Sequence, residues 1–191
     1  MDIRAWNDRY RSADESESNP TPLLQATAVQ LHPGRALDLA CGSGRNALWL
    51  AEQGWSVTAV DGAPAAIEIL RKRASGRALT VDAQVADLEK HEYHIEPSAW
   101  NFIVFCYYLQ RDLLEPAKSG LAPGGVLLAI VHITEPGEEP TYKRMKPGEL
   151  KGYFEHWDIL HYYDGKPNDP EHRRSVAEIV ARRPTSARTP S

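Results

Sequence analysis

Short apolar runs alternate with segments of helical periodicity along most of this chain. The runs predict strands at residues 36–40, 56–60, 79–86, 100–106, 125–132 and 175–181. Helical patterns cover residues 46–51 and continue from Pro64, where Ile67, Leu70 and Ala74 share one face. Strands that alternate with helices are typical of βαβ units around a parallel sheet. Together with the aromatic run of residues 153–163, these segments predict an α/β, Rossmann-like fold with a seven-stranded sheet and helices on both of its faces.

The same patterns divide the chain into three parts. Residues 1–34 combine an aromatic and basic opening, a polar stretch and an apolar helical run, which predicts a flap and a helix. Residues 35–183 carry the alternation and form the main domain. Within it, residues 134–152 are rich in Pro, Gly and charge, which favours a lid over the site. Residues 184–191 form a polar tail that we expect to fray.

Composition narrows the classes of partner. The 191 residues are 42% hydrophobic, enough for one core, and a net charge of −4 provides no broad basic field for nucleic acid. No apolar stretch approaches the length of a membrane span, and the opening lacks the pattern of a signal peptide. The histidines and the two cysteines show no metal-ligand spacing. We expect a cytoplasmic protein, a monomer or homodimer, with reduced thiols, no metal, and no nucleic-acid or membrane partner.

A glycine-containing loop lies between the first predicted strand and the first helix after it. In the run Asp38–Gly44, missing side chains at Gly42 and Gly44 let a ligand approach the backbone. A Gly-x-Gly pair alone is weak evidence, because tight turns without a ligand also use glycine. Asp38 would attract a ligand with an ammonium group and repel a pyrophosphate. The loop therefore favours S-adenosyl-methionine (SAM) over NAD.

Two further acids end the next two predicted strands. Asp61 lies at the distance from the glycines where such folds place an acceptor for ribose hydroxyls. Asp87 could accept a hydrogen bond from the amino group of an adenine, and the backbone N–H of Leu88 could donate a hydrogen bond to the same ring. Either acid alone is more often a helix cap or a surface acid. Together with Asp38 they predict a row of acids at one edge of the sheet.

These motifs resemble class I SAM-dependent methyltransferases. Residues 37–46 look like motif I of that family, residues 60–61 like its second acidic motif, and residues 121–125 like its turn into strand five. Residues 6–10, 45–51 and 146–150 resemble the small TehB-like (tellurite-resistance) and thiopurine-methyltransferase-like group. The resemblance implies strand order 3-2-1-4-5-7-6 with strand seven antiparallel, SAM as cofactor and S-adenosyl-homocysteine as product. The cofactor-binding residues it implies are Asp38, Ala40, Gly42, Gly44, Arg45, Asn46, Asp61, Gly62, Asp87, Leu88 and Phe105.

The resemblance also has one departure and leaves some residues open. Many relatives place a Ser or Thr cap where this chain has Gly62-Ala63-Pro64. Trp6 and Tyr10 are four apart and could fold over the cofactor as a flap, or simply pack. We interpret Cys106 as a buried structural thiol, because no His and acid accompany it in a hydrolase pattern. The strand order would bring it close to Cys41.

The methyl acceptor is expected to be a small molecule, with a thiol or another chalcogen nucleophile as one candidate. In-line displacement at a sulfonium methyl needs positioning and exclusion of water, and a general base is optional. His132 could equally be a strand-end histidine that bonds backbone, and Glu171-His172-Arg173 resembles the family's His-Arg element only loosely. The acceptor-side candidates are Tyr107, Tyr108, Arg111, His132, His172 and Arg173.

Two alternatives remain from the sequence. A non-catalytic SAM-binding regulatory domain would keep the cofactor loop without acceptor chemistry. A nicotinamide-dependent oxidoreductase would need a glycine turn that binds two phosphates and a proton donor near the hydride acceptor.

Overall fold

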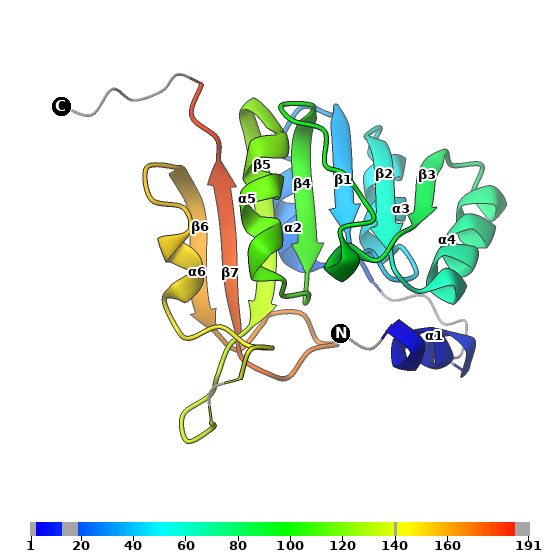
Figure 1. Ribbon diagram of the computed structural model, residues 1–191. Helices are drawn as coiled ribbons and strands as arrows, with labels where there is room; N and C mark the ends of the chain where they lie inside the picture. The colour runs from blue at the N-terminus through cyan, green and yellow to red at the C-terminus, as the bar shows by residue number, and fades with distance from the viewer. Residues whose placement is uncertain (1–2, 13–18, 140, 186–191) are drawn as a thin grey trace. The chain divides into compact units, whose positions relative to one another are not determined.

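A seven-stranded mixed sheet organises the protein. The computed structural model describes residues 3–12, 19–139 and 141–185 (Figure 1). The strand order is β3-β2-β1-β4-β5-β7-β6, and β7 runs antiparallel to both neighbours, so the expected order is confirmed. The chain forms two compact units, Met1–Ile95 and Glu96–Ser191. Part of the tail expected to fray, residues 186–191, lies outside the described residues.

The first unit contains three parallel strands and their crossover helices. β1 is buried along its whole length after Arg35, because a central parallel strand is covered on both faces. β3 is shorter than the expected span of residues 79–86. The elements are α1 (Ile3–Ser12), α2 (Pro22–Ala28), β1 (Arg35–Leu39), α3 (Arg45–Glu52), β2 (Ser56–Asp61), α4 (Pro64–Gly76), β3 (Val81–Val85) and the 3-10 turn η1 (Leu88–Lys90).

Helix α4 begins at the expected proline but takes its cap from another helix. Ile67, Leu70 and Ala74 are buried at helical spacing, as the periodicity predicted. Ala63 supplies no side-chain cap, and the backbone N–H of Ala65 donates instead to Asn7 Oδ1 at 2.9 Å. The capping hydrogen bond that a Ser or Thr before α4 would supply therefore comes from Asn7 of α1.

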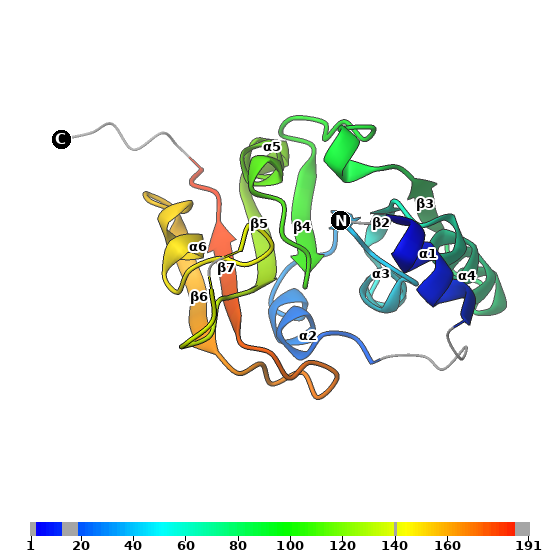
Figure 2. The ribbon, with the colours of Figure 1, turned by 60° about the horizontal axis from the view of Figure 1, so that its bottom comes forward.

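Helix α1 forms the opening of the first unit. Its half-buried side chains are Ile3, Trp6, Asn7 and Tyr10, which follow the spacing of one helical face. α1 packs against α4, and Figures 1 and 2 show it at the end of the unit where β1, β2 and β3 finish. The opening segment thus presents one face to the loops that follow these strands.

The second unit contains the other four strands. β4 covers the expected residues and β5 pairs with it in parallel. The elements are β4 (Trp100–Cys106), the 3-10 turn η2 (Arg111–Leu113), α5 (Leu114–Gly120), β5 (Leu121–His132), α6 (Glu149–Gly152), β6 (Asp158–Gly165) and β7 (Val176–Arg182).

Strand β5 begins four residues earlier than expected. Leu121 pairs with Trp100 and Val126 with Phe102, so the residues between them form an irregularity inside the strand. A Cβ at Gly125 would lie 3.0 Å from the Trp100 carbonyl oxygen, which explains the glycine there. The Pro-Gly-Gly sequence that suggests a turn is accommodated within the sheet.

Both cysteines are free thiols. Cys41 is buried and Cys106 is half-buried, and burial raises the pKa of the Cys41 thiol well above its ordinary value. Their expected proximity involves residues of both units and stays a prediction. Among the helices of the described residues, none is long and apolar enough to cross a membrane.

Candidate functional site

The chain turns sharply after β1 through a loop with left-handed backbone. Ala40, Gly42 and Gly44 have φ values of 55°, 55° and 86°. A Cβ at Gly44 would overlap Leu70 of α4, so this glycine allows α3 and α4 to approach each other. Gly42 and Gly44 are both buried, because other parts of the first unit pack where their side chains would be.

Asp38 is a buried carboxyl with unused bonding capacity. Its residue is 2% exposed, and Oδ2 has no hydrogen-bond partner among the described residues. Burial raises the pKa of Asp38 to about 7, assisted by the charge of Asp61 and opposed by Arg45 and the Ala47 N–H. Most buried polar atoms are paired, so this oxygen is a position for a ligand donor.

Asp61 joins the loops that follow β1 and β2. Its Oδ2 accepts from the Gly42 N–H and its Oδ1 from the Ala63 N–H, both at 2.8 Å. Burial raises the pKa of Asp61, and these two hydrogen bonds act against the rise. A carboxylate has about four acceptor positions, so Asp61 keeps capacity for ligand hydroxyls.

Asp87 acts as a cap in the structure. Its Oδ1 accepts from the Glu89 N–H at 3.0 Å, and its Oδ2 lies 2.9 Å from Lys90 Nζ. Burial acts to raise the pKa of Asp87, but Lys90 and the Glu89 N–H outweigh it and the pKa is lowered. Leu88 is buried behind it. The cap interpretation left open by the sequence is therefore observed, and an adenine contact stays a prediction.

Arg45 and Asn46 at the start of α3 make structural contacts. Arg45 Nη1 donates to the Asn19 carbonyl at 3.1 Å, and Asn46 Oδ1 accepts from the Thr21 N–H at 2.9 Å. These bonds join α3 to the segment before α2. The cofactor contacts that the resemblance implies for both residues stay predictions.

The face of α1 lies directly on two glycines of the expected cofactor site. The Tyr10 hydroxyl occupies the place where a Cβ of Gly42 would be, and Ile3 Cδ1 would lie 2.7 Å from a Cβ of Gly62. Burial, with the charge of Asp61, raises the pKa of Tyr10 to about 12, so its hydroxyl stays protonated. The sequence singled out Trp6 and Tyr10 but missed Ile3 and Asn7, which the same helical spacing would have found.

In the second unit, Tyr107 follows β4 and contacts the hairpin between β6 and β7. Its backbone is left-handed, with φ of 62°. Its ring stacks on His172 with centroids 3.3 Å apart, and its hydroxyl donates to Asp169 Oδ2 at 3.0 Å. Asp169 is buried, and its carbonyl accepts from the His172 N–H. Two acceptor-side candidates 65 positions apart are thereby brought together.

His132 ends β5 and completes this cluster. Its ring centroid lies 5.7 Å from that of Tyr107 and 6.0 Å from that of His172. Burial lowers the pKa of His132, and the cations Arg174 and Arg144 add to the effect, against a bond to the Ser175 backbone. Three of the six acceptor-side candidates therefore form one group, called here the Tyr107–His132–His172 cluster.

The other candidates behave differently. Tyr108 is buried and its hydroxyl donates to Gln110 Oε1 at 2.6 Å. Arg173 is exposed and makes no ion pair within the described residues. Phe105 is 2% exposed inside β4, where it contributes to the core, so its implied cofactor contact stays a prediction.

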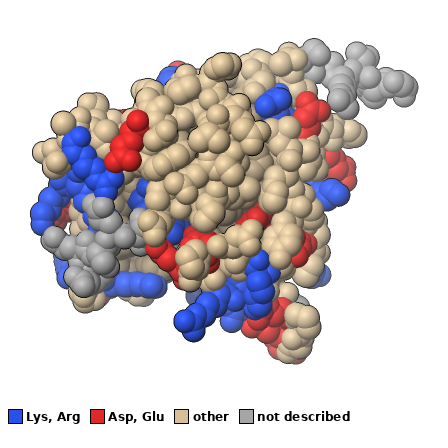
Figure 3. Space-filling view, turned by 180° about the vertical axis from the view of Figure 1, so that it is seen from behind, with Lys and Arg blue, Asp and Glu red and all other residues tan. Residues whose placement is uncertain are grey.

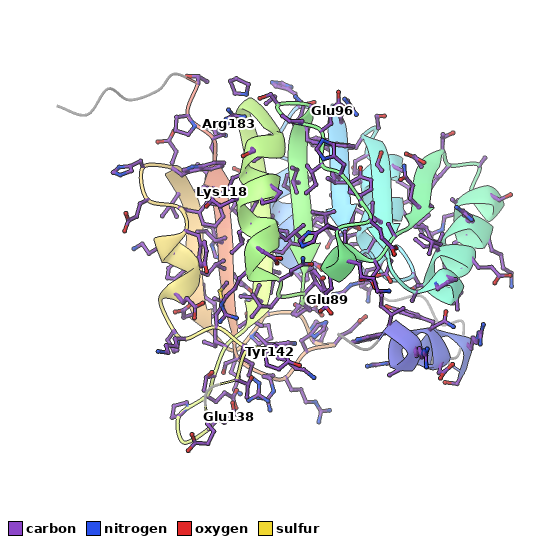
Figure 4. The ribbon with its side chains drawn as sticks, viewed as in Figure 1. Glu89, Glu96, Lys118, Glu138, Tyr142 and Arg183 are labelled. Carbon is purple, nitrogen blue, oxygen red and sulfur yellow. The ribbon has the colours of Figure 1, made fainter. Side chains whose placement is uncertain are left out.

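Arg111 binds the part of the chain where the sequence predicts a lid. Its described residues, 134–139 and 141–152, are called here the lid, and whether they cover the site stays a prediction. Arg111 Nε donates to Glu149 Oε1 at 2.7 Å, its Nη1 to the Tyr142 carbonyl at 2.8 Å and its Nη2 to the Arg144 carbonyl at 3.0 Å. Figure 4 labels Tyr142 on this segment. With all three nitrogens engaged, we interpret Arg111 as an anchor of the lid.

A second polar network ties the lid to the hairpin before β7. Glu135 Oε1 accepts from Lys166 Nζ at 2.5 Å and from Ser175 Oγ at 2.7 Å, and the Lys166 bond is the largest cause that lowers the pKa of Glu135 to about 2. Glu138, labelled in Figure 4, bonds both Arg144 and Arg174. Figure 3 shows basic and acidic side chains side by side at the lower edge of its view. Sequence reasoning missed this network, since its members share no periodicity.

Comparisons with known proteins agree with the architecture. A family model described as tellurite resistance protein TehB matches residues 7–169. Hemagglutinin 1 of Eikenella corrodens is 30% identical over 144 residues, covering 71% of this chain and 48% of that protein. A probable S-adenosyl-L-methionine-dependent methyltransferase TehB from Haemophilus influenzae is 27% identical over 142 residues, covering 69% and 49%. This chain thus spans about half the length of these relatives.

Solved structures share the fold. The crystal structure of TehB from Haemophilus influenzae has a TM-score of 0.72 at 25% identity, covering 84% of this chain and 61% of that one. A geranyl diphosphate C-methyltransferase from Streptomyces coelicolor has a TM-score of 0.72 at 13% identity, covering 95% and 96%. The second likeness concerns the fold alone.

Proposed function

This chain belongs to the tellurite resistance protein TehB family, and we propose that it is a SAM-dependent methyltransferase that acts on a small-molecule acceptor. The observation that carries the proposal is Asp38, whose buried Oδ2 has no partner among the described residues and which directly precedes the glycine loop. A ligand with an ammonium group satisfies that oxygen, and a pyrophosphate does not.

The residues of the first unit fit SAM. Asp38 Oδ2 would accept from the ammonium of the methionine end, and the free acceptor positions of Asp61 would take ribose hydroxyls. Tyr10 and Ile3 of α1 cover the glycines at this edge, which helps to exclude water. When bound, SAM supplies an electrophilic methyl carbon on a sulfonium.

The acceptor side of the proposal rests on the Tyr107–His132–His172 cluster. Its members follow β4, end β5 and precede β7, and ligands of parallel α/β sheets bind at the carboxyl ends of the strands. The exposed guanidinium of Arg173 adjoins His172 and would attract an anionic nucleophile such as a thiolate or a reduced chalcogen anion. A purely regulatory SAM-binding domain has no need for such a cluster.

Calorimetry and a transfer assay test the proposal. We expect SAM and S-adenosyl-homocysteine to bind with micromolar affinity and NAD to show no heat, because Asp38 opposes a pyrophosphate. Incubation with methyl-labelled SAM and a panel of thiols, selenide and telluride should give labelled product. Tight NAD binding without SAM binding would refute the cofactor. SAM binding without transfer to any of these acceptors would favour the regulatory domain.

Replacing Asp61 is expected to weaken the cofactor site. Asp61→Ala removes the acceptor of the Gly42 N–H and of ribose hydroxyls, so SAM binding should fall by about 1.5–3 kcal/mol. The exposed Asp82 on β3 provides a matched control, because Asp82→Ala removes an acid of the same unit away from the loop. An unchanged dissociation constant for Asp61→Ala, measured by calorimetry on a folded variant, would remove Asp61 from the site.

A further inference from the structure

One ring nitrogen of His132 accepts no hydrogen bond from the described residues. Nδ1 is buried and has no hydrogen-bond partner among the described residues. An interaction with the Ser175 backbone acts to raise the pKa of the ring, which is the effect of a carbonyl acceptor. Because Nδ1 has no partner among the described residues, we assign this interaction, and the hydrogen of the neutral ring, to Nε2. Nδ1 is therefore a proton acceptor.

The surroundings of His132 keep the ring neutral. Tyr107 and His172 face it from the ends of β4 and the β6–β7 hairpin. The Tyr107 hydroxyl already donates to Asp169, so it does not satisfy Nδ1. The cations Arg144 from the lid and Arg174 from the hairpin, both held by Glu138, disfavour a positive charge on the ring. Burial acts in the same direction.

An unsatisfied buried acceptor needs an explanation, and its position supplies one. Buried polar side-chain atoms are nearly always paired, and the exceptions include catalytic groups that wait for a substrate. Hydrogen bonds of a general base are often incomplete before the substrate binds, and a single water can complete them. His132 ends the strand next to β4 and belongs to the cluster assigned to the acceptor.

We propose that Nδ1 of His132 accepts the proton of a neutral thiol acceptor, directly or through one water. The S–H bond breaks, the Nδ1–H bond forms, and the electron pair stays on sulfur for bonding to the methyl carbon. The methyl–sulfonium bond would break in the same displacement, and S-adenosyl-homocysteine would leave with its electron pair. After transfer the imidazolium releases its proton to solvent. This inference rests on the proposed function and deepens it, because it names alkyl thiols that are mainly protonated at neutral pH as the substrate class.

A comparison of two thiols isolates the proton step. His132→Gln keeps a donor near Nε2 for the Ser175 carbonyl but has no base at Nδ1. With 2-mercaptoethanol at pH 7, kcat/KM should fall about 100-fold, which lies within the range for loss of a general base. With 4-nitrothiophenol, which is ionised at that pH, kcat/KM should stay within about threefold of wild type.

The pH profile gives a second measurement. For 2-mercaptoethanol the wild-type kcat/KM should be flat between pH 7 and the thiol pKa, because thiol and base are both in their reactive forms. In His132→Gln it should rise about tenfold per pH unit, following thiol ionisation alone. His156→Gln, an exposed histidine of the same unit, is the control and should match wild type.

Nitrogen-15 NMR of the free protein supplies a readout independent of activity. The His132 ring should appear as the Nε2–H tautomer with a bare Nδ1 at neutral pH. An Nδ1–H tautomer, or equal loss on both thiols, would overturn the inference while leaving methyl transfer intact. Selective loss in His172→Gln but not in His132→Gln would assign the base to His172 instead. Failure of wild type to methylate either thiol, with SAM bound, would overturn the thiol acceptor as well.

Discussion

Asp38→Asn is expected to weaken SAM binding about 10- to 100-fold while making the free protein more stable above pH 7. Asn keeps an oxygen for the Ala47 N–H but removes the charge that would bind the ammonium. A hydrogen bond to a charged group contributes about 1.5–3 kcal/mol, which sets the size of the loss. Opposite effects on binding and stability identify a group kept for a ligand rather than for folding.

The stability change follows from the direction of the pKa shift. The pKa of Asp38 is raised from 3.8 to about 7 in the folded protein. Its contribution to stability is therefore fully present below about pH 4 and is lost as the pH rises through about 7, for a total of about 4 kcal/mol. Asn cannot ionise, so urea unfolding of Asp38→Asn should lack this loss between pH 4 and 8. A parallel decline in both proteins would contradict the burial argument.

SAM affinity should depend on pH through the same carboxyl. Binding to the ionised form should strengthen about tenfold per pH unit below 7 and level off above it. Near pH 8 an α-amino group begins to lose its proton, so affinity should fall again. Calorimetry from pH 5.5 to 9 measures both limbs, and Asp82→Ala controls for loss of a surface acid. A rising limb that persists in Asp38→Asn would assign it to another group.

Gly44→Ala is expected to lower the free energy of unfolding by about 2–5 kcal/mol. Gly44 has φ of 86°, where an L side chain costs about 1–2 kcal/mol. The added Cβ would also overlap Leu70 in the core of α4, and overpacking of this kind costs about 1–3 kcal/mol. Gly44 ends the glycine loop and directly precedes α3. A Cβ that pushes α4 away would therefore also shift the loop, and we expect SAM binding to weaken.

The chain offers a matched control for this glycine. Gly54 has the same φ of 86°, but nothing lies within 4 Å of its added Cβ. Gly54→Ala should therefore cost only the backbone strain, about 1–2 kcal/mol. The difference between the two variants in urea unfolding isolates the packing between α3 and α4. Equal losses would show that Leu70 moves aside without cost.

Local patterns in the sequence predicted most of the fold. β4 is an apolar run interrupted by Asn101, and its bounds of Trp100–Cys106 were predicted because a strand buried on both faces is mostly apolar. The start of α4 at Pro64 was predicted because proline fits the first turn of a helix. By contrast, β5 begins at Leu121 because a bulge absorbs a Pro-Gly-Gly sequence, and pairing between strands decides that.

Part of the candidate site was also predicted from local patterns in the sequence. The glycine loop and the acids Asp38 and Asp61 were found from the sequence, because turn geometry and strand ends leave a local signature. The resemblance of residues 37–46 to a known motif then predicted the class of cofactor. What the sequence by itself determined is the order of the elements, the glycine loop and the family.

Only the tertiary structure decided which polar groups are engaged and which are open. Asn7 caps α4, Arg111 anchors the lid and Asp87 caps η1. Within the part of the chain that the structure describes, Asp38 Oδ2 and His132 Nδ1 have no hydrogen-bond partner. Each outcome depends on atoms brought together from distant positions, and hydrogen bonds at such range impose no period on the sequence. The physical reason is that burial and partner geometry, which set pKa and reactivity, arise only once the chain has folded.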